Sequence, residues 1–217
     1  GIMLPNHAPY VIAEQFGTLA ALFPGRVDLG LGRAPGTDQA TLQAIRTPQG
    51  AAERFPQEVM ELMHWFAPAE EPGYVRAWPA CGTEVDFWIL GSSQYGARLA
   101  AELGLPYGFA SHFAPDYLDE ALHIYRSRFK PSPQLQAPRA MVGVNVVCAD
   151  TSAEARRLFT TAQMSFTGIF RGMRGLSQPP IDDIATYWTP REEAQVSRML
   201  GCAVVGDPAE VKAGLDG

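Results

Sequence analysis

Apolar residues recur every three or four positions in several long segments, which is the spacing of one face of a helix. The pattern predicts helices over 8–23, 55–66, 94–103, 116–129 and 153–170, and a short one that starts at Pro208. Pro24-Gly25 ends the first segment and Gly104 ends the third, as helix-terminating residues do. The helix over 153–170 is expected to have its N-terminal cap at Thr151 or Ser152.

Short apolar runs lie between these helices and predict buried strands. We expect strands over 26–32, 87–90, 107–111 and 141–148, and a short segment over 202–206. Strands that alternate with amphipathic helices at this spacing are typical of parallel βαβ units. Residues 171–190 are rich in Pro and Gly and aperiodic, so an irregular excursion is expected there.

The expected fold class is therefore α/β. Four strands alone would leave the edges of the sheet open. We expect an incomplete (β/α)8 TIM barrel, a single domain over 1–217 truncated at both ends, in which strands four to seven are visible with their helices. A doubly wound open sheet is the alternative, but Pro35 stands where a Rossmann Gly-x-Gly-x-x-Gly fingerprint needs its last glycine.

Composition narrows the class of partner. The 217 residues are 47% hydrophobic and 18% charged, enough apolar material for a sizeable core. The net charge is −6 and the basic residues are scattered, which argues against binding to nucleic acid or to an anionic membrane. We therefore expect a small-molecule partner. Cys81, Cys148 and Cys202 are odd in number and lie far apart, so we expect reduced thiols in a cytoplasmic protein.

Two segments could bind a phosphate. Arg33 follows Gly32 at the end of the strand over 26–32, and a guanidinium offers paired donors to phosphate oxygens. On the residues alone, a structural ion pair of Arg33 with Asp28 or Asp38 is the competing interpretation.

The second segment, Gly91-Ser92-Ser93, stands between a strand and a helix, where backbone N–H groups, the helix dipole and two hydroxyls favour an anion. Simple N-capping by either serine is the competing interpretation. Both segments would lie at the same face of a parallel barrel, which strengthens the phosphate interpretation of each.

Other candidates concern a substrate pocket. His7 and His112 are expected in loops at the catalytic face, and Trp188 lies in the irregular segment; each has a structural interpretation as well. No metal site is expected, because no histidine pair has ligand spacing such as His-Glu-x-x-His. No Gly-x-Ser-x-Gly elbow is present, which argues against a hydrolase.

Several runs resemble one family. The segments 4–15, 22–33, 89–106 and 205–208 are similar to motifs of the bacterial luciferase-like flavin-dependent monooxygenases, and the likeness extends over nearly the whole chain. The resemblance implies a (β/α)8 barrel that binds FMN at the C-terminal ends of its strands. Arg33 and Ser92 would bind the phosphate, and Gly91, Ser93 and Tyr95 would complete the cradle.

The resemblance also implies a reaction. Reduced FMN, supplied by a separate reductase, would act with O2 on an organic substrate in a homodimer formed partly through residues 9–23. The family's pocket histidine belongs to a strand before Gly1, so no catalytic acid or base is assigned. A deazaflavin-dependent hydride-transfer enzyme and a non-catalytic flavin-binding relative remain the alternatives.

Overall fold

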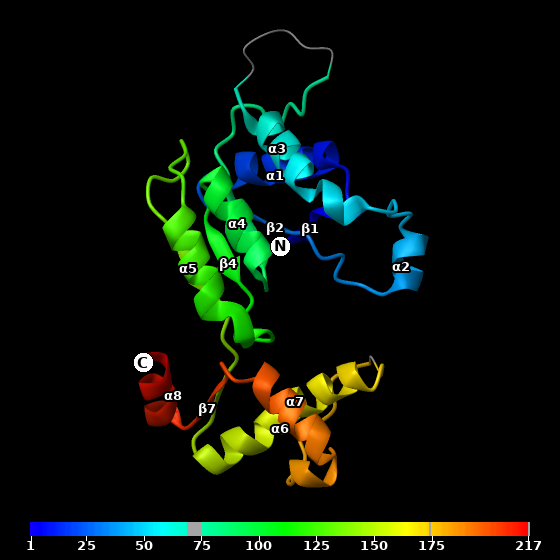
Figure 1. The fold of residues 1–217 in the computed structure, drawn as a ribbon, viewed down its shortest axis with the longest axis vertical. Helices are drawn as coiled ribbons and strands as arrows, with labels where there is room; N and C mark the ends of the chain where they lie inside the picture. Colours follow the sequence, from blue (N-terminus) through cyan, green and yellow to red (C-terminus); the bar gives the residue numbers. More distant parts are fainter. Residues whose placement is uncertain (69–74, 174, 217) are drawn as a thin grey trace. The chain divides into compact units, whose positions relative to one another are not determined.

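The computed structural model describes residues 1–68, 75–173 and 175–216 (Figure 1). The chain divides into two compact units. Unit 1 consists of Gly1–Phe109 and Glu120–Met141, and unit 2 consists of Ala110–Asp119 and Val142–Gly217. Both units combine parallel strands with helices, which confirms the expected α/β class.

Unit 1 is built on a sheet with the strand order β1-β2-β3-β4-β5. The strands are β1 (Ile2–Met3), β2 (Asp28–Gly32), β3 (Asp86–Gly91), β4 (Tyr107–Phe109) and β5 (Ala140–Val142), the last residue of which belongs to unit 2. The pairs β1–β2, β2–β3 and β3–β4 are parallel. The C-terminal ends of these strands therefore meet at one edge of the sheet.

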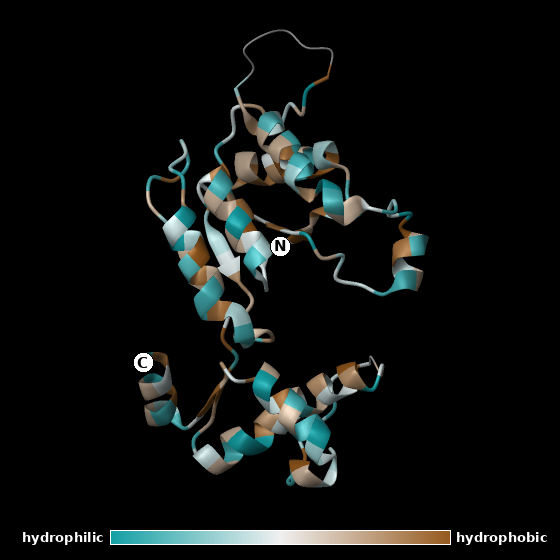
Figure 2. Ribbon diagram, in the orientation of Figure 1, coloured by the Kyte–Doolittle hydropathy of each residue, from teal (hydrophilic) through white to brown (hydrophobic). Residues whose placement is uncertain are grey.

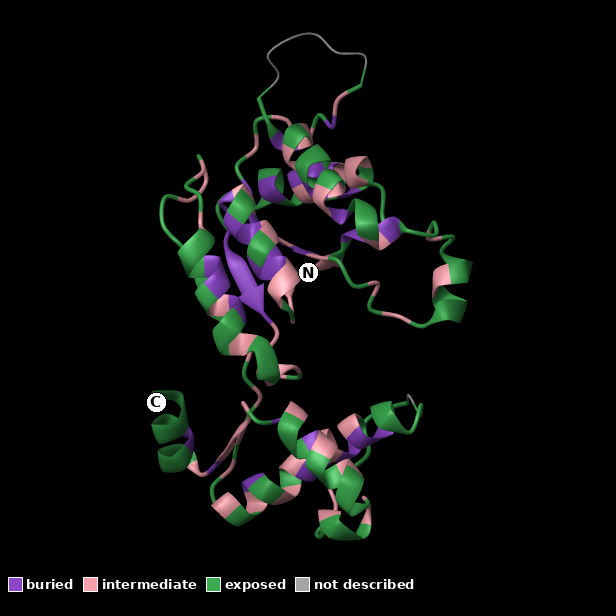
Figure 3. Ribbon diagram, viewed as in Figure 1, coloured by how far each residue is buried: buried purple, intermediate pink, exposed green. Residues whose placement is uncertain are grey.

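In the described part of the chain, five helices accompany this sheet. They are α1 (Pro9–Leu22), α2 (Gln39–Ala44), α3 (Phe55–Phe66), α4 (Gln94–Leu103) and α5 (Leu118–Arg128), with 3-10 turns η1 (Leu4–Asn6) and η2 (Ala51–Arg54). α3 and α4 have the bounds that the apolar spacing predicts. β1 and α2 were not predicted: β1 has two residues, and α2 buries none of its six, so neither carries an apolar period (Figure 3).

The two faces of the sheet differ in what they carry. Leu29, Leu31 and Ile89 are fully buried on one face, on the side where α4 packs against β3. On the other face, Leu90 lies between two glycines. A Cβ atom on Gly30 or on Gly108 would come within 2.8 Å of the Leu90 side chain, so the glycines leave Leu90 its space.

Unit 2 contains the parallel pair β6 (Val146–Cys148) and β7 (Val204–Gly206). Its helices are α6 (Ser152–Phe170), α7 (Pro190–Met199) and α8 (Pro208–Asp216), with 3-10 turns η3 (Pro115–Tyr117) and η4 (Ile184–Thr186). The Thr151 hydroxyl accepts the Glu154 amide, so Thr151 is the cap of α6. Hydrophobic and hydrophilic positions alternate around α6, as the spacing predicts (Figure 2).

The single strand expected over 141–148 is wrong. The chain forms two strands there, β5 and β6, which belong to different sheets. The break is fixed by hydrogen bonds: the Ser111 hydroxyl donates to the Gly143 carbonyl at 2.6 Å, and the Asn145 side chain donates to the His112 carbonyl at 2.5 Å. The strand expected over 107–111 also ends early, at Phe109, because Ser111 takes part in this contact.

Candidate functional site

Both candidate phosphate segments lie at the C-terminal edge of the sheet in unit 1. Gly32, the last residue of β2, stands opposite Leu90 in the parallel register. Arg33 therefore follows β2 at the level where Gly91 ends β3. A Cβ atom on Gly32 would meet only the Ile2 carbonyl, at 3.8 Å, so the space beside this edge is open to a ligand.

The Arg33 side chain is exposed and stacks on an aromatic ring. Its guanidinium carbon lies 4.1 Å from the centre of the Tyr95 ring. Arg33 forms no ion pair with a carboxylate in the part of the chain that the structure describes, so the structural pairing with Asp28 or Asp38 is not observed. A guanidinium held on a ring and unpaired keeps its donors available for an anion.

The Gly91-Ser92-Ser93 turn leads directly into α4. Ser93 occupies the N-cap position with an extended backbone, but its hydroxyl accepts no hydrogen bond from the helix. The Ser92 hydroxyl likewise has no hydrogen-bond partner among the described residues. The first amides of α4 thus lack a side-chain cap, which leaves N–H donors at the positive end of the helix.

Tyr107 supports this turn from β4, and sequence reasoning missed it. Its hydroxyl donates to the Ser93 carbonyl at 3.0 Å. A Cβ atom on Gly96 would come within 3.1 Å of the Tyr107 ring, and one on Gly91 within 3.7 Å of its hydroxyl. Burial raises the pKa of Tyr107 well above its ordinary value, so the hydroxyl keeps the hydrogen that it donates. The glycines at 91 and 96 were the sequence signal for this close approach.

Asn6 is a second residue that the sequence did not single out. Its side-chain amide donates to the Pro35 carbonyl at 2.8 Å, and its amide oxygen accepts the Thr47 hydroxyl at 3.2 Å. Asn6 therefore ties the turn after β1 to both ends of the excursion that carries α2. One of these ends lies two residues after Arg33, so Asn6 restrains the loop on which Arg33 stands.

The pocket candidates fall into different units. His7 is exposed just after η1 in unit 1, past the end of β1 and hence at the same sheet edge as Arg33. His112 belongs to unit 2, with its ring 4.7 Å from the Phe113 ring and against Gly143. Trp188, also in unit 2, is half-buried between η4 and α7.

The described residues include neither a metal-binding cluster nor a membrane-spanning helix. Over 1–68, 75–173 and 175–216, no group of three His, Cys, Asp or Glu side chains is placed to hold a metal ion. Within the same ranges, no helix has both the length and the apolar character needed to cross a bilayer. The described residues of the site form an anion cradle, made of the Arg33 guanidinium and the backbone amides at the start of α4.

The chain is similar in sequence to several proteins of one family. The family described as luciferase-like monooxygenase matches residues 1–217. A luciferase-like monooxygenase of Escherichia coli (strain K12) is 51% identical over 99% of this chain, and the uncharacterized YvbT of Bacillus subtilis is 49% identical over 100%. The N-acetyl-S-alkylcysteine monooxygenase of B. subtilis is 30% identical over 72%. The chain spans 64% and 65% of the length of the first two relatives.

Solved structures show the same fold. The crystal structure of apo-MsnO8 matches 100% of this chain and 66% of that one, with a TM-score of 0.81 and 30% identity. The oxygenating constituent of 3,6-diketocamphane monooxygenase in complex with FMN matches 99% of this chain and 66% of that one, with a TM-score of 0.62 and 18% identity.

An F420-dependent secondary alcohol dehydrogenase matches 100% of this chain and 67% of that one, with a TM-score of 0.60 and 13% identity. At this level of identity the last two matches bear on fold alone. The family match, however, extends over every residue of the sequence, and half of the residues are identical in the E. coli relative. This chain belongs to the luciferase-like monooxygenase family.

Proposed function

We propose that the protein is an FMN-dependent monooxygenase and that this chain holds the phosphate of the cofactor at the C-terminal edge of β2 and β3. The observation that carries the proposal is Arg33, which has no carboxylate partner among the described residues and stands beside the uncapped start of α4. A phosphate monoester carries close to two negative charges at neutral pH, which suits one guanidinium and a helix N-terminus together.

Each residue of the site offers a different group to the phosphate. Arg33 would donate hydrogen bonds to phosphate oxygens, and its contact with the Tyr95 ring holds the guanidinium in place. Ser92 and Ser93 would contribute hydroxyls and backbone amides, Gly32 leaves room for the ligand to approach the backbone, and Gly91 begins the turn that carries these donors. The donor set and the open edge therefore fit the phosphate of FMN.

When bound, reduced FMN supplies the two electrons with which one atom of O2 enters the substrate and the other leaves as water. The chain's part is to fix the phosphate end, so that the ring is presented in one orientation. No catalytic acid or base is assigned within residues 1–217. His7, His112 and Trp188 remain our candidates for contact with the substrate.

A deazaflavin is the second candidate cofactor. It is supported by the shared fold of the F420-dependent secondary alcohol dehydrogenase, and the cradle at Arg33 would suit any phosphate-bearing flavin. The two candidates differ in chemistry, because a deazaflavin transfers hydride without consuming O2. A relative that binds flavin without turnover is the third candidate.

Oxygen consumption separates the three. The full-length protein is mixed with chemically reduced FMN or with reduced F420, and O2 uptake is recorded with and without a panel of thioethers and ketones. With reduced FMN we expect one atom from labelled O2 to enter the product and the yield of H2O2 to fall when the substrate is present, because the second oxygen atom then leaves as water. Hydride transfer from reduced F420 with no O2 uptake would favour the second candidate, and binding without either reaction would favour the third.

We also propose that the protein acts as a cytoplasmic homodimer, supplied with reduced FMN by a separate reductase. The dimer is supported by α1, whose outward face carries exposed apolar side chains: Val11, Leu19 and Leu22 are 45%, 41% and 65% exposed. Its opposite face, with Ile12, Ala13 and Gly17, is buried, and α1 packs on α3. An apolar stripe of this kind on a surface helix is typical of a helix-to-helix interface.

A further inference from the structure

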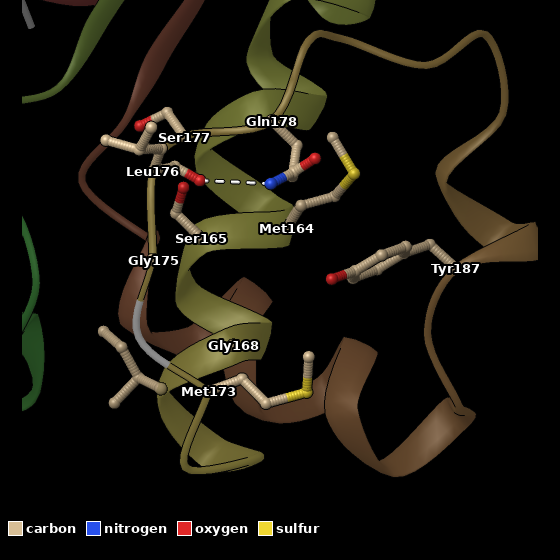
Figure 4. Close-up of a pocket in the computed structure, with 10 residues that line it drawn as sticks. Met164, Ser165, Gly168, Met173, Gly175, Leu176, Ser177, Gln178 and Tyr187 are labelled. Carbon is tan, nitrogen blue, oxygen red and sulfur yellow. Dashed lines mark hydrogen bonds between the residues drawn. The ribbon is translucent and has the colours of Figure 1, made fainter.

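Unit 2 contains a cavity of about 460 Å³ beside α6, within the size range of small-molecule sites (Figure 4). Four apolar side chains line it: Met164, Ile169, Met173 and Leu176. Leu176 and Met173 are 91% and 66% exposed, although both are large and apolar. Methionine side chains adapt their shape to a ligand, which suits two of them in one cavity wall.

Tyr187 faces these side chains from the segment before α7. Its ring points into the cavity, with the hydroxyl directed at α6 between Met164 and Met173 (Figure 4). No described residue accepts a hydrogen bond from this hydroxyl. The guanidinium carbon of Arg171 lies 4.8 Å from the ring centre, but a guanidinium has no acceptor. The phenolic hydrogen is thus available to an acceptor inside the cavity.

The position of Tyr187 is fixed by a network outside the cavity. Arg171 donates to the Tyr187 carbonyl at 2.8 Å, and it donates to both carboxylate oxygens of Glu192 at 2.6 and 2.9 Å. Glu192 in turn accepts the Thr189 amide at the start of α7. A ring held in this way loses little freedom when a ligand binds, which favours affinity.

The charges around the cavity indicate which net charge of a ligand the cavity favours. Among the described residues that line the cavity none carries an ionisable acid or base at neutral pH, and the adjacent Arg171 and Glu192 neutralise each other. A charged ligand would lose its hydration there without gaining an ion pair. The cavity therefore favours a neutral molecule, and at roughly 30 Å³ per water-sized group it holds about fifteen non-hydrogen atoms.

We infer that unit 2 binds a small, uncharged, mostly apolar molecule that carries one hydrogen-bond acceptor, and that Tyr187 donates to this acceptor. The inference does not depend on the flavin, because the cavity lies in unit 2 and the phosphate cradle in unit 1. Probe binding is therefore measured without FMN, and a failure of either site leaves the other intact.

The test uses three probes of similar size on the full-length protein labelled with [methyl-13C]methionine. Acetophenone has an acceptor, ethylbenzene lacks one, and benzoate carries a charge. We expect acetophenone to shift the Met164 and Met173 methyl signals and not that of Met60, an exposed methionine in unit 1. Acetophenone should bind about two- to tenfold more tightly than ethylbenzene, and benzoate should not bind.

Tyr187→Phe is the decisive variant, since it keeps the ring and removes only the hydroxyl. It should reduce acetophenone affinity to that of ethylbenzene and leave ethylbenzene affinity unchanged, which also shows that the cavity is intact. Tyr117→Phe, at an exposed tyrosine elsewhere in unit 2, should change neither affinity.

Three results would overturn the inference. Benzoate could bind as tightly as acetophenone, or the preference for acetophenone could persist in Tyr187→Phe. Alternatively, no probe could shift Met164 or Met173. In that last case, protection of both methyl groups from a soluble paramagnetic agent would show that another segment or a second copy of the chain covers the cavity.

Discussion

At the scale of single residues, the hydrogen bond from Tyr107 to the Ser93 carbonyl joins β4 to the turn that precedes α4. A second tyrosine of unit 1, Tyr125, donates from its hydroxyl to the Leu105 carbonyl at 2.9 Å, and the same oxygen accepts the Arg139 amide at 3.1 Å. Both rings are fully buried, and burial raises the pKa of both phenols. Of the two tyrosines, Tyr107 contacts the proposed phosphate cradle and Tyr125 does not. A comparison of variants at the two positions therefore distinguishes an effect on the cradle from an effect on general stability.

We expect Tyr107→Phe to weaken FMN binding by about two- to tenfold, because one neutral hydrogen bond no longer orients the turn. Tyr125→Phe should leave FMN affinity unchanged. Tyr107→Phe should lower the free energy of unfolding by about 0.5–1.5 kcal/mol, and Tyr125→Phe by at least as much because it also removes the acceptor of the Arg139 amide; both are measured by urea denaturation. Equal losses of FMN affinity in the two variants would show that Tyr107 acts only through general stability.

At the scale of elements, the first turn of α7 is held by a reciprocal cap. The Thr189 hydroxyl accepts the Glu192 amide, and the Glu192 carboxylate accepts the Thr189 amide at 2.8 Å. The hydrogen bonds from Arg171 are the main cause that lowers the pKa of Glu192 to about 2, and the Thr189 amide adds to it. The charged carboxylate is therefore the form that the folded state prefers.

This lowered pKa predicts a pH dependence. Glu192 should stabilise the fold fully above its ordinary pKa of 4.5, and the contribution should be lost as the pH falls toward about 2. We expect Glu192→Gln to destabilise the protein at neutral pH and the difference from wild type to shrink with acidification, in urea unfolding between about pH 7 and about pH 3. Glu193→Gln removes a charge from the same turn and should show no such trend; identical profiles would contradict the assignment.

The elements also show what the sequence can predict. α3 and α4 were predicted to the residue because their apolar periods are strong, and because Gly104 ends α4 in the left-handed conformation, at φ 65. The division between β5 and β6 was not predictable, since it depends on Ser111 and Asn145 reaching across the fold. α7 was not predicted, although Thr189-Pro190-Arg191-Glu192 carries a local capping signal.

At the scale of the whole molecule, some features of the candidate site could be predicted from the sequence and others could not. Arg33 and the Gly91-Ser92-Ser93 turn could be predicted to lie together, because the C-terminal ends of parallel strands meet at one edge. Tyr107 and Asn6 could not, because their contacts join residues far apart in the sequence. Such contacts leave no periodic or local signal.

The proposed dimer is tested at this scale. Leu22→Glu places a charge on the exposed apolar face of α1 and should convert the full-length protein to a monomer, measured by light scattering coupled to size-exclusion chromatography. Leu158→Glu, at a leucine of α6 that is 38% exposed, should leave the mass unchanged. A wild-type protein of monomeric mass, or a dimer that survives Leu22→Glu, would contradict the proposal.

The central claim is that Arg33 binds the flavin phosphate, and riboflavin, which lacks that phosphate, tests it most directly. FMN and riboflavin are titrated into the full-length wild type, Arg33→Ala and Arg126→Ala, the last of which removes the same charge from an exposed position on α5. We predict that Arg33→Ala weakens FMN binding by about 10- to 150-fold, leaves riboflavin binding unchanged, and so removes most of the preference for FMN. Arg126→Ala should change neither affinity. An unchanged preference for FMN over riboflavin in Arg33→Ala would contradict the account.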